Sequence, residues 1–350
     1  MKKIYLLLVV MVTIGCVSCN NEWEDEQFVQ KVSFKATLND DGVSPIYIRY
    51  QPDGAKKYDV PLLVSGSTPN SVNRKVYIGL DPDTLNTLNL ERFGTYRKEL
   101  YYQQLDPQYY NMPESIEIPA GQSQVVLPIN FTLGGANNSD PLDMVDQYIL
   151  PLTIVGDAST NTQVNERKYY RKALLNVIPF NEYSGTYDGS QQKIYLEDQP
   201  TAFTITERKA YVYDENTIFF YMGLRDVNYV DRKYYKLFVQ FTDEKYEGKH
   251  KLNVWTDNGG AEGNNLGFLT EVDILGHTRL KQPVYTIQTE MDATKPYLKH
   301  VYYTLYLDYT FEDYTISSGN RLKYTVNGTL NMQRNLNTLI PDQDQQIEWN

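Results

Sequence analysis

The fold is decided by one stretch near the middle of the 350-residue chain, Leu175-Asn176-Val177-Ile178-Pro179-Phe180-Asn181-Glu182. A run typical of a strand ends here, because Pro179 has no N–H to donate to a neighbouring strand. A different pattern opens directly afterwards with Tyr183-Ser184-Gly185-Thr186-Tyr187-Asp188-Gly189. The length of the chain also favours two domains of ordinary size. We therefore expect one domain over residues 28–178 and a second over 180–350.

Alternation of apolar and polar residues continues on both sides of this boundary. In 46–50, 125–131 and 148–154 every second residue is apolar, which is typical of strands with one buried face. Clusters of Gly, Asn, Pro and Ser separate these segments and predict turns. Patterns that favour a helix are short and confined to 84–90 and 142–145.

The two halves predict two kinds of β-structure. The first half has short strands and many prolines, which favours an immunoglobulin-like β-sandwich. The second half has about eight longer strands that follow one another, which favours an up-and-down antiparallel β-barrel. Single long strands are expected over 202–213 and 300–313. The predicted fold class is therefore all-β, a sandwich followed by a barrel.

The N-terminus carries an export signal. Lys2 and Lys3 precede an apolar run over 4–14, and small residues lead to Cys19. The run is too short to cross a membrane, which takes about 20 apolar residues, and the pattern is that of a secretory signal. A Cys after a small residue makes it a lipoprotein signal. We expect a signal peptide over 1–18 and lipid on Cys19, with Cys16 as the alternative.

An acidic tether follows over 19–27. Its cluster Glu22-Trp23-Glu24-Asp25-Glu26 resembles the signal with which Bacteroidetes move lipoproteins to the cell surface. The other interpretation is a solvated linker that happens to be acidic. The sequence thus predicts an outer-membrane protein, lipid-anchored and exposed at the cell surface.

Composition excludes several classes of function. The net charge of −11 argues against nucleic acid, since binding it needs a basic face. No cysteine follows Cys19, which excludes a disulfide scaffold, a thiol nucleophile and a cysteine-built zinc site. The three histidines lack metal-ligand spacing. We expect no metal and no cofactor; the oxygen-rich run 257–265 lacks the spacing of a known calcium loop and is better explained as a flexible hairpin loop.

Aromatic residues supply the candidate binding site. The chain has 31 Tyr, and most of them fit half-exposed positions of β-sheets. Trp255, Tyr302 and Tyr306 instead share the polar faces of their strands. A ring among polar groups suits a sugar, whose apolar face stacks on the ring while its hydroxyls are hydrogen-bonded. Asn258 and Asn264, in the loop after Trp255, complete the set of candidates. The alternative is that such rings pack under a loop or the other domain.

Three stretches carry a family resemblance: Cys19–Phe28 with Val32–Ala36, Leu105–Tyr110 running into Ile116–Gly121, and Tyr148–Leu152. Together they resemble the N-terminal immunoglobulin-like domain of lipoproteins from Bacteroidetes polysaccharide-utilisation loci. That domain also precedes the catalytic barrel in some family 18 endo-β-N-acetylglucosaminidases. Residues 180–350 resemble the lipocalin-like C-terminal domain that is often fused to it.

The resemblance implies a non-catalytic protein. The family 18 catalytic run, Asp-x-x-Asp-x-Asp-x-Glu, is absent from this sequence. What the resemblance implies is a surface lipoprotein that binds an oligo- or polysaccharide for a TonB-dependent transporter and its companion glycan-binding lipoprotein; no site residue carries over. Two rivals remain. A surface glycoside hydrolase would need a carboxylate pair, for which Glu262, Glu271 and Asp273 are candidates. A structural or adhesion lipoprotein would use an exposed sheet edge.

Overall fold

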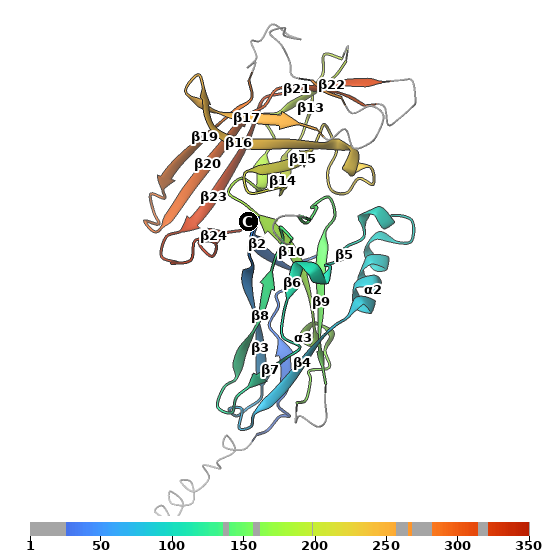
Figure 1. Ribbon diagram of the computed structural model, residues 1–350, viewed down its shortest axis with the longest axis vertical. Coiled ribbons are helices and arrows are strands. Elements are labelled where there is room, and N and C mark those ends of the chain that lie inside the picture. The colour runs from blue at the N-terminus through green and yellow to red at the C-terminus, as the bar shows by residue number, and fades with distance from the viewer. Residues whose placement is uncertain are drawn as a thin grey trace, which may run out of the picture.

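The computed structural model describes residues 26–135, 140–156, 162–197, 199–256, 265–267, 282–313 and 321–349. It shows two β-rich bodies, one above the other in Figure 1, and very little helix. The lower body is a sandwich of two sheets and the upper body is a closed barrel. The predicted fold class, a sandwich followed by a barrel, is confirmed.

The sandwich is built from two sheets whose inner faces share one core. The first sheet has the order β1 (Lys31–Phe34), β3 (Lys56–Ser65), β8 (Gln124–Phe131) and β6 (Tyr110–Asn111). The second has the order β2 (Ser44–Arg49), β10 (Lys172–Phe180), β9 (Tyr148–Val155), β4 (Arg74–Leu80) and β7 (Ser115–Ile118), and β5 (Gln103–Gln104) also pairs with β9. Every second residue of β2 is buried, as the alternation predicted. Strand β2 lies at the edge of its sheet, next to β10 alone.

Strand β10 runs two residues further than the sequence suggested. Pro179 and Phe180 remain in the strand and pair in parallel with Ile48 and Arg49 of β2. The pairing of β10 with β9 on its other side ends at Val177. The N–H that Pro179 lacks is therefore not required by the β9 ladder, and the proline is tolerated. The next strand, β11, begins at Gly185.

Helix α2 (Pro82–Phe93) covers the outer face of the second sheet, where Leu85 packs near Ile149. The side chain of Asp81 caps its first turn by accepting a hydrogen bond from the Thr84 N–H, 3.1 Å away, as expected of an N-cap. A shorter helix, α3, spans Lys168–Arg171. Among the described residues, no helix has the length and apolarity needed to cross a membrane.

Eight strands close the barrel. Their order is β11 (Gly185–Asp188), β14 (Glu207–Val212), β15 (Thr217–Tyr221), β16 (Lys236–Tyr246), β17 (Lys249–Trp255), β19 (Val284–Met291), β20 (Leu298–Tyr306) and β23 (Thr329–Asn337). Pairing of Asp188 in β11 with Asn331 in β23 completes the ring. A short strand, β24 (Ile347–Glu348), adds to β23 from outside. All neighbouring pairs in the ring are antiparallel, as predicted.

A second sheet extends one end of the barrel. Its order is β13 (Phe203–Thr204), β12 (Lys193–Leu196), β22 (Leu322–Asn327), β21 (Tyr309–Asp313) and β18 (Asn265–Gly267). The single strands expected over 202–213 and 300–313 are therefore each broken in two. Between β22 and β23, Gly328 adopts a φ of 120°, and its N–H donates a hydrogen bond to the Asp308 carboxylate. The breaks between β13 and β14, between β20 and β21 and between β22 and β23 lie on strands of the same two sheets, so pairing passes there from the barrel to the second sheet.

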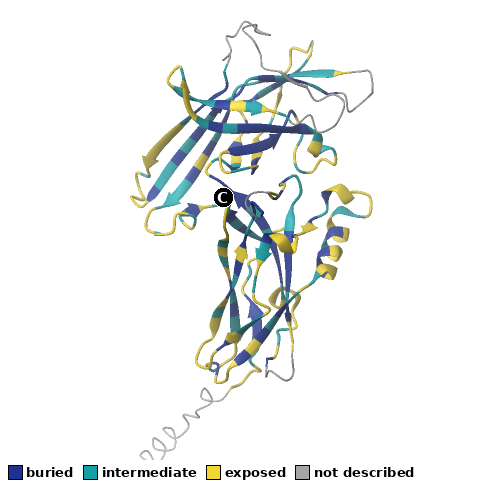
Figure 2. Ribbon diagram, viewed as in Figure 1, coloured by how far each residue is buried: buried dark blue, intermediate teal, exposed yellow. Residues whose placement is uncertain are grey.

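Side chains fill the interior of the barrel. An eight-stranded barrel is just wide enough for this. The buried residues that meet inside it are Tyr187, Phe220, Tyr235, Leu237, Tyr303, Leu305, Tyr309 and Phe311, among others. Strand β15 is buried throughout, whereas buried and intermediate residues alternate along β20 (Figure 2). The apolar residues that alternate along 301–311 therefore point into the barrel, where these rings fill the space.

The outer face of β14, β15 and β16 rests on the sandwich. Phe238, which shares a strand face with Lys236 and Gln240, is only 3% exposed. The rings of Tyr213, Phe219 and Trp255 pack around it. One cluster joins Tyr211, Phe219, Tyr221 and Phe238 of the barrel to Leu142 and Met144 of the sandwich. The segment 142–145, expected to be helix-like, is a turn in which the Asp143 carboxylate accepts from the Val145 N–H.

Candidate functional site

Trp255 lies at the end of β17, on the outer face of the barrel. Its side chain is 37% exposed and stacks on Phe238, with ring centroids 5.4 Å apart and planes 13° apart. Beside the stack, the Asn253 amide donates to the Gln240 side-chain oxygen at 3.0 Å. We call Trp255, Phe238, Asn253 and Gln240 the barrel platform. It combines a partly exposed ring with amide groups, which is what a pyranose requires.

Tyr302 and Tyr306 lie elsewhere on the barrel. Both point outward from β20, as strand parity predicted. Tyr302 donates its hydroxyl to the Glu290 carboxylate at 2.8 Å. The Lys249 ammonium lies 3.6 Å from the centroid of the Tyr306 ring, so a cation occupies that ring face.

The strand register separates these two tyrosines from Trp255. Val284 of β19 pairs with both Lys251 of β17 and Tyr306 of β20, so Lys251 and Tyr306 lie at the same level. From that level, Trp255 lies four residues in one direction and Tyr302 four residues in the other. At roughly 3.3 Å per residue, they are about 26 Å apart along the strands. The three aromatics do not form one contiguous surface.

The remaining sequence candidates fall outside the described residues. Asn258, Asn264 and nearly all of the 257–265 run lie there, as does Cys19. Within the described ranges, no three His, Cys, Asp or Glu side chains group as a metal site would require.

A large cavity that the sequence did not reveal lies between the sandwich and the C-terminal segment. It has a volume of about 750 Å³ and is lined by residues of strands β2 and β3, one from each sheet of the sandwich, and of the C-terminal segment. Ile46, Ile48 and Val60 form its apolar inner wall, and Tyr47, Tyr58 and Trp349 also line it. Burial raises the pKa of both Tyr47 and Tyr58, so their hydroxyls stay protonated near neutral pH. We call it the interdomain cavity.

Trp349 anchors the C-terminal segment against both domains. Its ring stacks on Tyr47 of the sandwich, with centroids 3.9 Å apart, and meets the Phe180 ring edge-on at 4.8 Å. The Arg334 guanidinium of the barrel lies 5.6 Å from its centroid. No motif pointed to Trp349. The only signal was an aromatic residue after the β-favouring Ile347 in a polar C-terminus.

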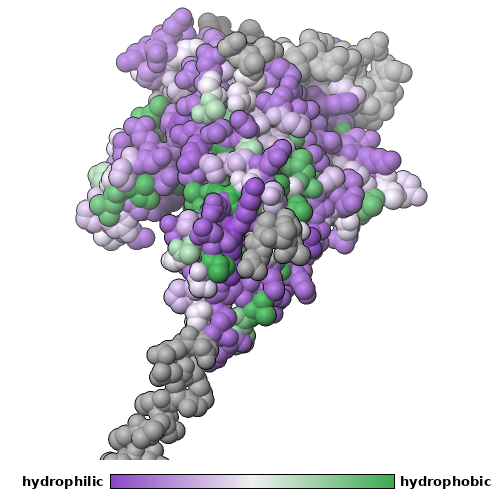
Figure 3. All heavy atoms as spheres, turned by 60° about the horizontal axis from the view of Figure 1, so that its bottom comes forward, coloured by the Kyte–Doolittle hydropathy of each residue, from purple (hydrophilic) through white to green (hydrophobic). Residues whose placement is uncertain are grey.

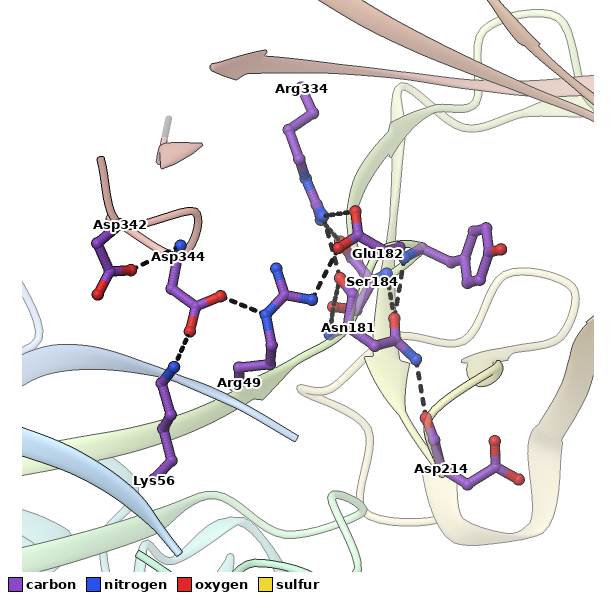
Figure 4. A network of polar contacts seen from close by, with 10 residues as sticks. Arg49, Lys56, Asn181, Glu182, Ser184, Asp214, Arg334, Asp342 and Asp344 are labelled. Carbon is purple, nitrogen blue, oxygen red and sulfur yellow. Dashed lines mark hydrogen bonds and ion pairs between the residues drawn. The ribbon is translucent and has the colours of Figure 1, made fainter. Parts of the chain in front are cut away.

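Ion pairs hold the rim of the interdomain cavity. Figure 4 shows the Asp344 carboxylate between Lys56 and Arg49, and it is paired with both. Burial alone would raise the pKa of Asp344, but hydrogen bonds from Lys56 and Arg49 hold it below its usual value. Arg49 also pairs with Glu182 at 2.7 Å. Asp344 therefore stays ionised, which suits a structural role and not that of a general acid.

The face shown in Figure 3 is mostly hydrophilic, with small and separate hydrophobic patches. This agrees with the acidic composition. On that face, protein contact through one broad apolar surface is not favoured.

Two family models match the chain. The first, described as a domain of unknown function, DUF4973, matches residues 23–158, and the second, described only as "-like, C-terminal", matches residues 171–331. No curated protein matches.

Several solved structures are similar over nearly the full length. A multidomain protein including DUF1735 from Bacteroides ovatus is 40% identical, with a TM-score of 0.76 and coverage of 91% of this chain and 100% of its own. A second Bacteroides ovatus protein, of unknown function, is also 40% identical, with a TM-score of 0.77 and the same coverage. An auxiliary nutrient binding protein from Bacteroides thetaiotaomicron is 33% identical, with a TM-score of 0.75 and coverage of 90% and 100%.

Proposed function

The chain belongs to a family of two-domain Bacteroides proteins that join a DUF4973 domain to a second β-domain, and from this we propose that it is a surface-anchored protein that binds a nutrient glycan without cleaving it. The relative described as an auxiliary nutrient binding protein supports the nutrient-binding part. The observation that carries the glycan part is the barrel platform, where the Trp255 ring lies beside the paired amides of Asn253 and Gln240.

The platform is tested with Trp255→Ala. Retardation in native gels that contain starch, xylan, mannan or galactan identifies the glycan, and titration then gives the affinity. Loss of a large aromatic anchor should weaken binding by about 1–3 kcal/mol, or roughly fivefold to more than a hundredfold. The stability of the protein should fall by no more than about 1 kcal/mol, the scale of one aromatic pair.

Tyr96→Ala is the matched control, because Tyr96 is 95% exposed on the sandwich and its loss should change neither quantity. Unchanged affinity of Trp255→Ala for a glycan that the native protein binds would remove the barrel platform from the proposal. A fall in stability of ~3–5 kcal/mol would instead mark Trp255 as a core residue.

The surface-anchored part rests on Cys19 and on the geometry at the start of the described chain. The Glu26 carboxylate accepts hydrogen bonds from the N–H and hydroxyl groups of Ser67 and Thr68, in the turn between β3 and β4. In Figure 1 the end of β3 and the start of β4, which this turn connects, lie at the end of the sandwich far from the barrel. A lipid at Cys19 would thus hold the sandwich nearer the membrane and present the barrel outward.

Cys19→Ala should abolish lipid labelling and release the protein from the membrane fraction, whereas Cys16→Ala should leave both unchanged. If Cys16→Ala has these effects and Cys19→Ala does not, Cys16 is the lipidated residue. Neutral replacements of the acidic residues over 22–26 should reduce protease access on intact cells; unchanged access would defeat the surface-signal interpretation.

The absence of catalysis is tested with the glycan itself. A preparation that binds the glycan should release no new reducing ends from it during prolonged incubation, and steady release would support the glycoside hydrolase instead.

The partners that we propose are a TonB-dependent transporter and its companion glycan-binding lipoprotein. Both should be recovered when the protein is purified from membranes.

A further inference from the structure

We propose that the interdomain cavity is a second binding site, which accepts a neutral sugar unit between strands β2 and β3 and the C-terminal segment. The proposal rests on the proposed function for the class of ligand, but it is independent of the barrel platform. Five residues of the C-terminal segment line the cavity: Asp342, Asp344, Gln345, Ile347 and Trp349. The site is complete only when that segment is docked on the sandwich.

One residue of the cavity wall carries a buried polar group without a partner. Ser44 lines the cavity and is 3% exposed, and no group within the described part of the chain hydrogen-bonds its hydroxyl. Its surroundings are apolar, with Ile46 and Leu175 also in the wall. A buried hydroxyl left unpaired is costly, by about 1–3 kcal/mol. A hydroxyl of a bound ligand that reached Ser44 would form the hydrogen bond that the Ser44 hydroxyl lacks.

The walls suit the apolar face of a sugar. The volume of about 750 Å³ lies within the roughly 300–1,000 Å³ of ordinary ligand pockets. Tyr58 offers aromatic carbon to a ring's C–H groups, and Tyr47 and Tyr58 both add hydroxyls, the combination that favours carbohydrates over purely apolar ligands. The Tyr47 and Trp349 rings stack on each other in the same wall. The size allows a short oligosaccharide to enter, with one unit at Ser44.

The charges of the rim favour a neutral ligand. Four cationic and three anionic side chains line the cavity, so their charges nearly cancel. Lys57 pairs with Asp59 at 2.9 Å, and Asp344 pairs with both Lys56 and Arg49. An acidic sugar that approached Arg49, Lys56 or Lys57 would have to compete with the carboxylate already paired there, whereas a neutral sugar leaves these pairs intact.

Tryptophan fluorescence separates this site from the barrel platform. The chain has three tryptophans, Trp23, Trp255 and Trp349. In the full chain, Trp23→Phe with Trp255→Phe leaves Trp349 as reporter of the cavity, and Trp23→Phe with Trp349→Phe leaves Trp255 as reporter of the platform. Both proteins are titrated with neutral malto-, xylo-, manno- and galacto-oligosaccharides, and with an acidic oligogalacturonide, after their melting temperatures have been compared.

We expect at least one neutral oligosaccharide to change the Trp349 emission saturably. Ser44→Ala should weaken that response about three- to tenfold, the equivalent of one neutral hydrogen bond, and the exposed Ser71→Ala, on the β3–β4 turn, should not. If Trp255 emission changes on titration and Trp349 emission does not, the cavity proposal is wrong and the barrel platform is supported. If Trp349 emission changes and Trp255 emission does not, the cavity proposal is supported and the barrel platform is wrong. Silence of both reporters, a response to the acidic probe alone, or no effect of Ser44→Ala also overturns the cavity proposal.

Discussion

At the scale of single residues, two buried arginines bind main-chain oxygens at the domain boundary, Arg232 across it and Arg334 on the linker. Arg232 donates to the carbonyls of Val145 and Glu99, at 3.0 and 2.8 Å, in the sandwich. Arg334 donates to the carbonyls of Asn181 and Ser184, at 3.0 and 2.6 Å, in the interdomain linker. A guanidinium presents several donors in a fixed plane. Each arginine therefore sets the orientation of the barrel as well as its attachment.

His300 carries a pH-dependent contact on the outer face of the barrel. Its ring nitrogens lie 2.7 Å from the Asn335 side-chain oxygen and 3.1 Å from the Asp292 carboxylate. Hydrogen bonds to Asn335 and Asp292 raise the pKa of His300 above its ordinary value of 6.5. Because the folded-state pKa is raised, this contact stabilises the fold fully below about pH 6.5 and stops doing so as pH rises through the folded-state pKa.

An NMR titration of the three histidines measures this directly. His300 should titrate above 6.5, and Asp292→Asn should bring its pKa down. A His300 that titrates at or below 6.5 in the native protein would contradict the assigned contacts.

At the scale of elements, the long strands of the barrel bend where their ladders break. Alternation runs through 300–313 almost without interruption, yet β20 and β21 separate there. Gly328, between β22 and β23, lies beside this break, since its carbonyl accepts from the Leu307 N–H and its own N–H donates to Asp308. At Gly328, a Cβ would lie 2.2 Å from the Gln191 carbonyl oxygen, so only glycine permits the chains to approach so closely.

Gly328→Ala should therefore lower the free energy of unfolding by more than the strain of its left-handed backbone angle alone would. Gly121 is the matched control, since its φ of 84° is also left-handed and nothing lies within 4 Å of a Cβ built on it. Gly121→Ala should cost about 1–2 kcal/mol of unfolding free energy, and Gly328→Ala at least about 3 kcal/mol. Chemical denaturation measures both, and equal losses would mean that the close approach to Gln191 relaxes freely.

At the scale of the whole molecule, one hydrophobic cluster crosses the domain boundary. Rings on the outer face of the barrel pack with the 142–144 turn, and Lys236 pairs with Asp143 at 3.0 Å. The C-terminal segment adds a second contact through Trp349. Motion of the two domains is therefore restricted more than the linker length would suggest.

Fragments of residues 28–178 and 180–350 test the domain boundary. Each retains a core of its own, so each should fold and unfold cooperatively in calorimetry. The barrel fragment should melt at a lower temperature than the full chain, because Phe219 and Phe238 lose their cover. Fragments that are soluble only when produced together would mean one continuous domain or an obligate interface.

Much of the site lay beyond prediction from the sequence. Strand parity placed Trp255, Tyr302 and Tyr306 on the outer face, and all three are there. Parity could not show that a cation covers Tyr306, or that the register sets Tyr302 far from Trp255. Both depend on the neighbouring strands, which local alternation does not specify.

Local patterns were enough to predict the β-class, the order of sandwich and barrel, and the strand faces, since these follow from period-2 alternation and turn residues. Contacts between distant segments were not predictable in this way: Phe238 belongs to a cluster that reaches the sandwich, the ladders break beside Gly328, and Trp349 stacks on Tyr47 beside a cavity. The physical reason is separation along the chain. Each of these contacts joins residues from distant segments, and its free energy depends on packing that no local pattern records.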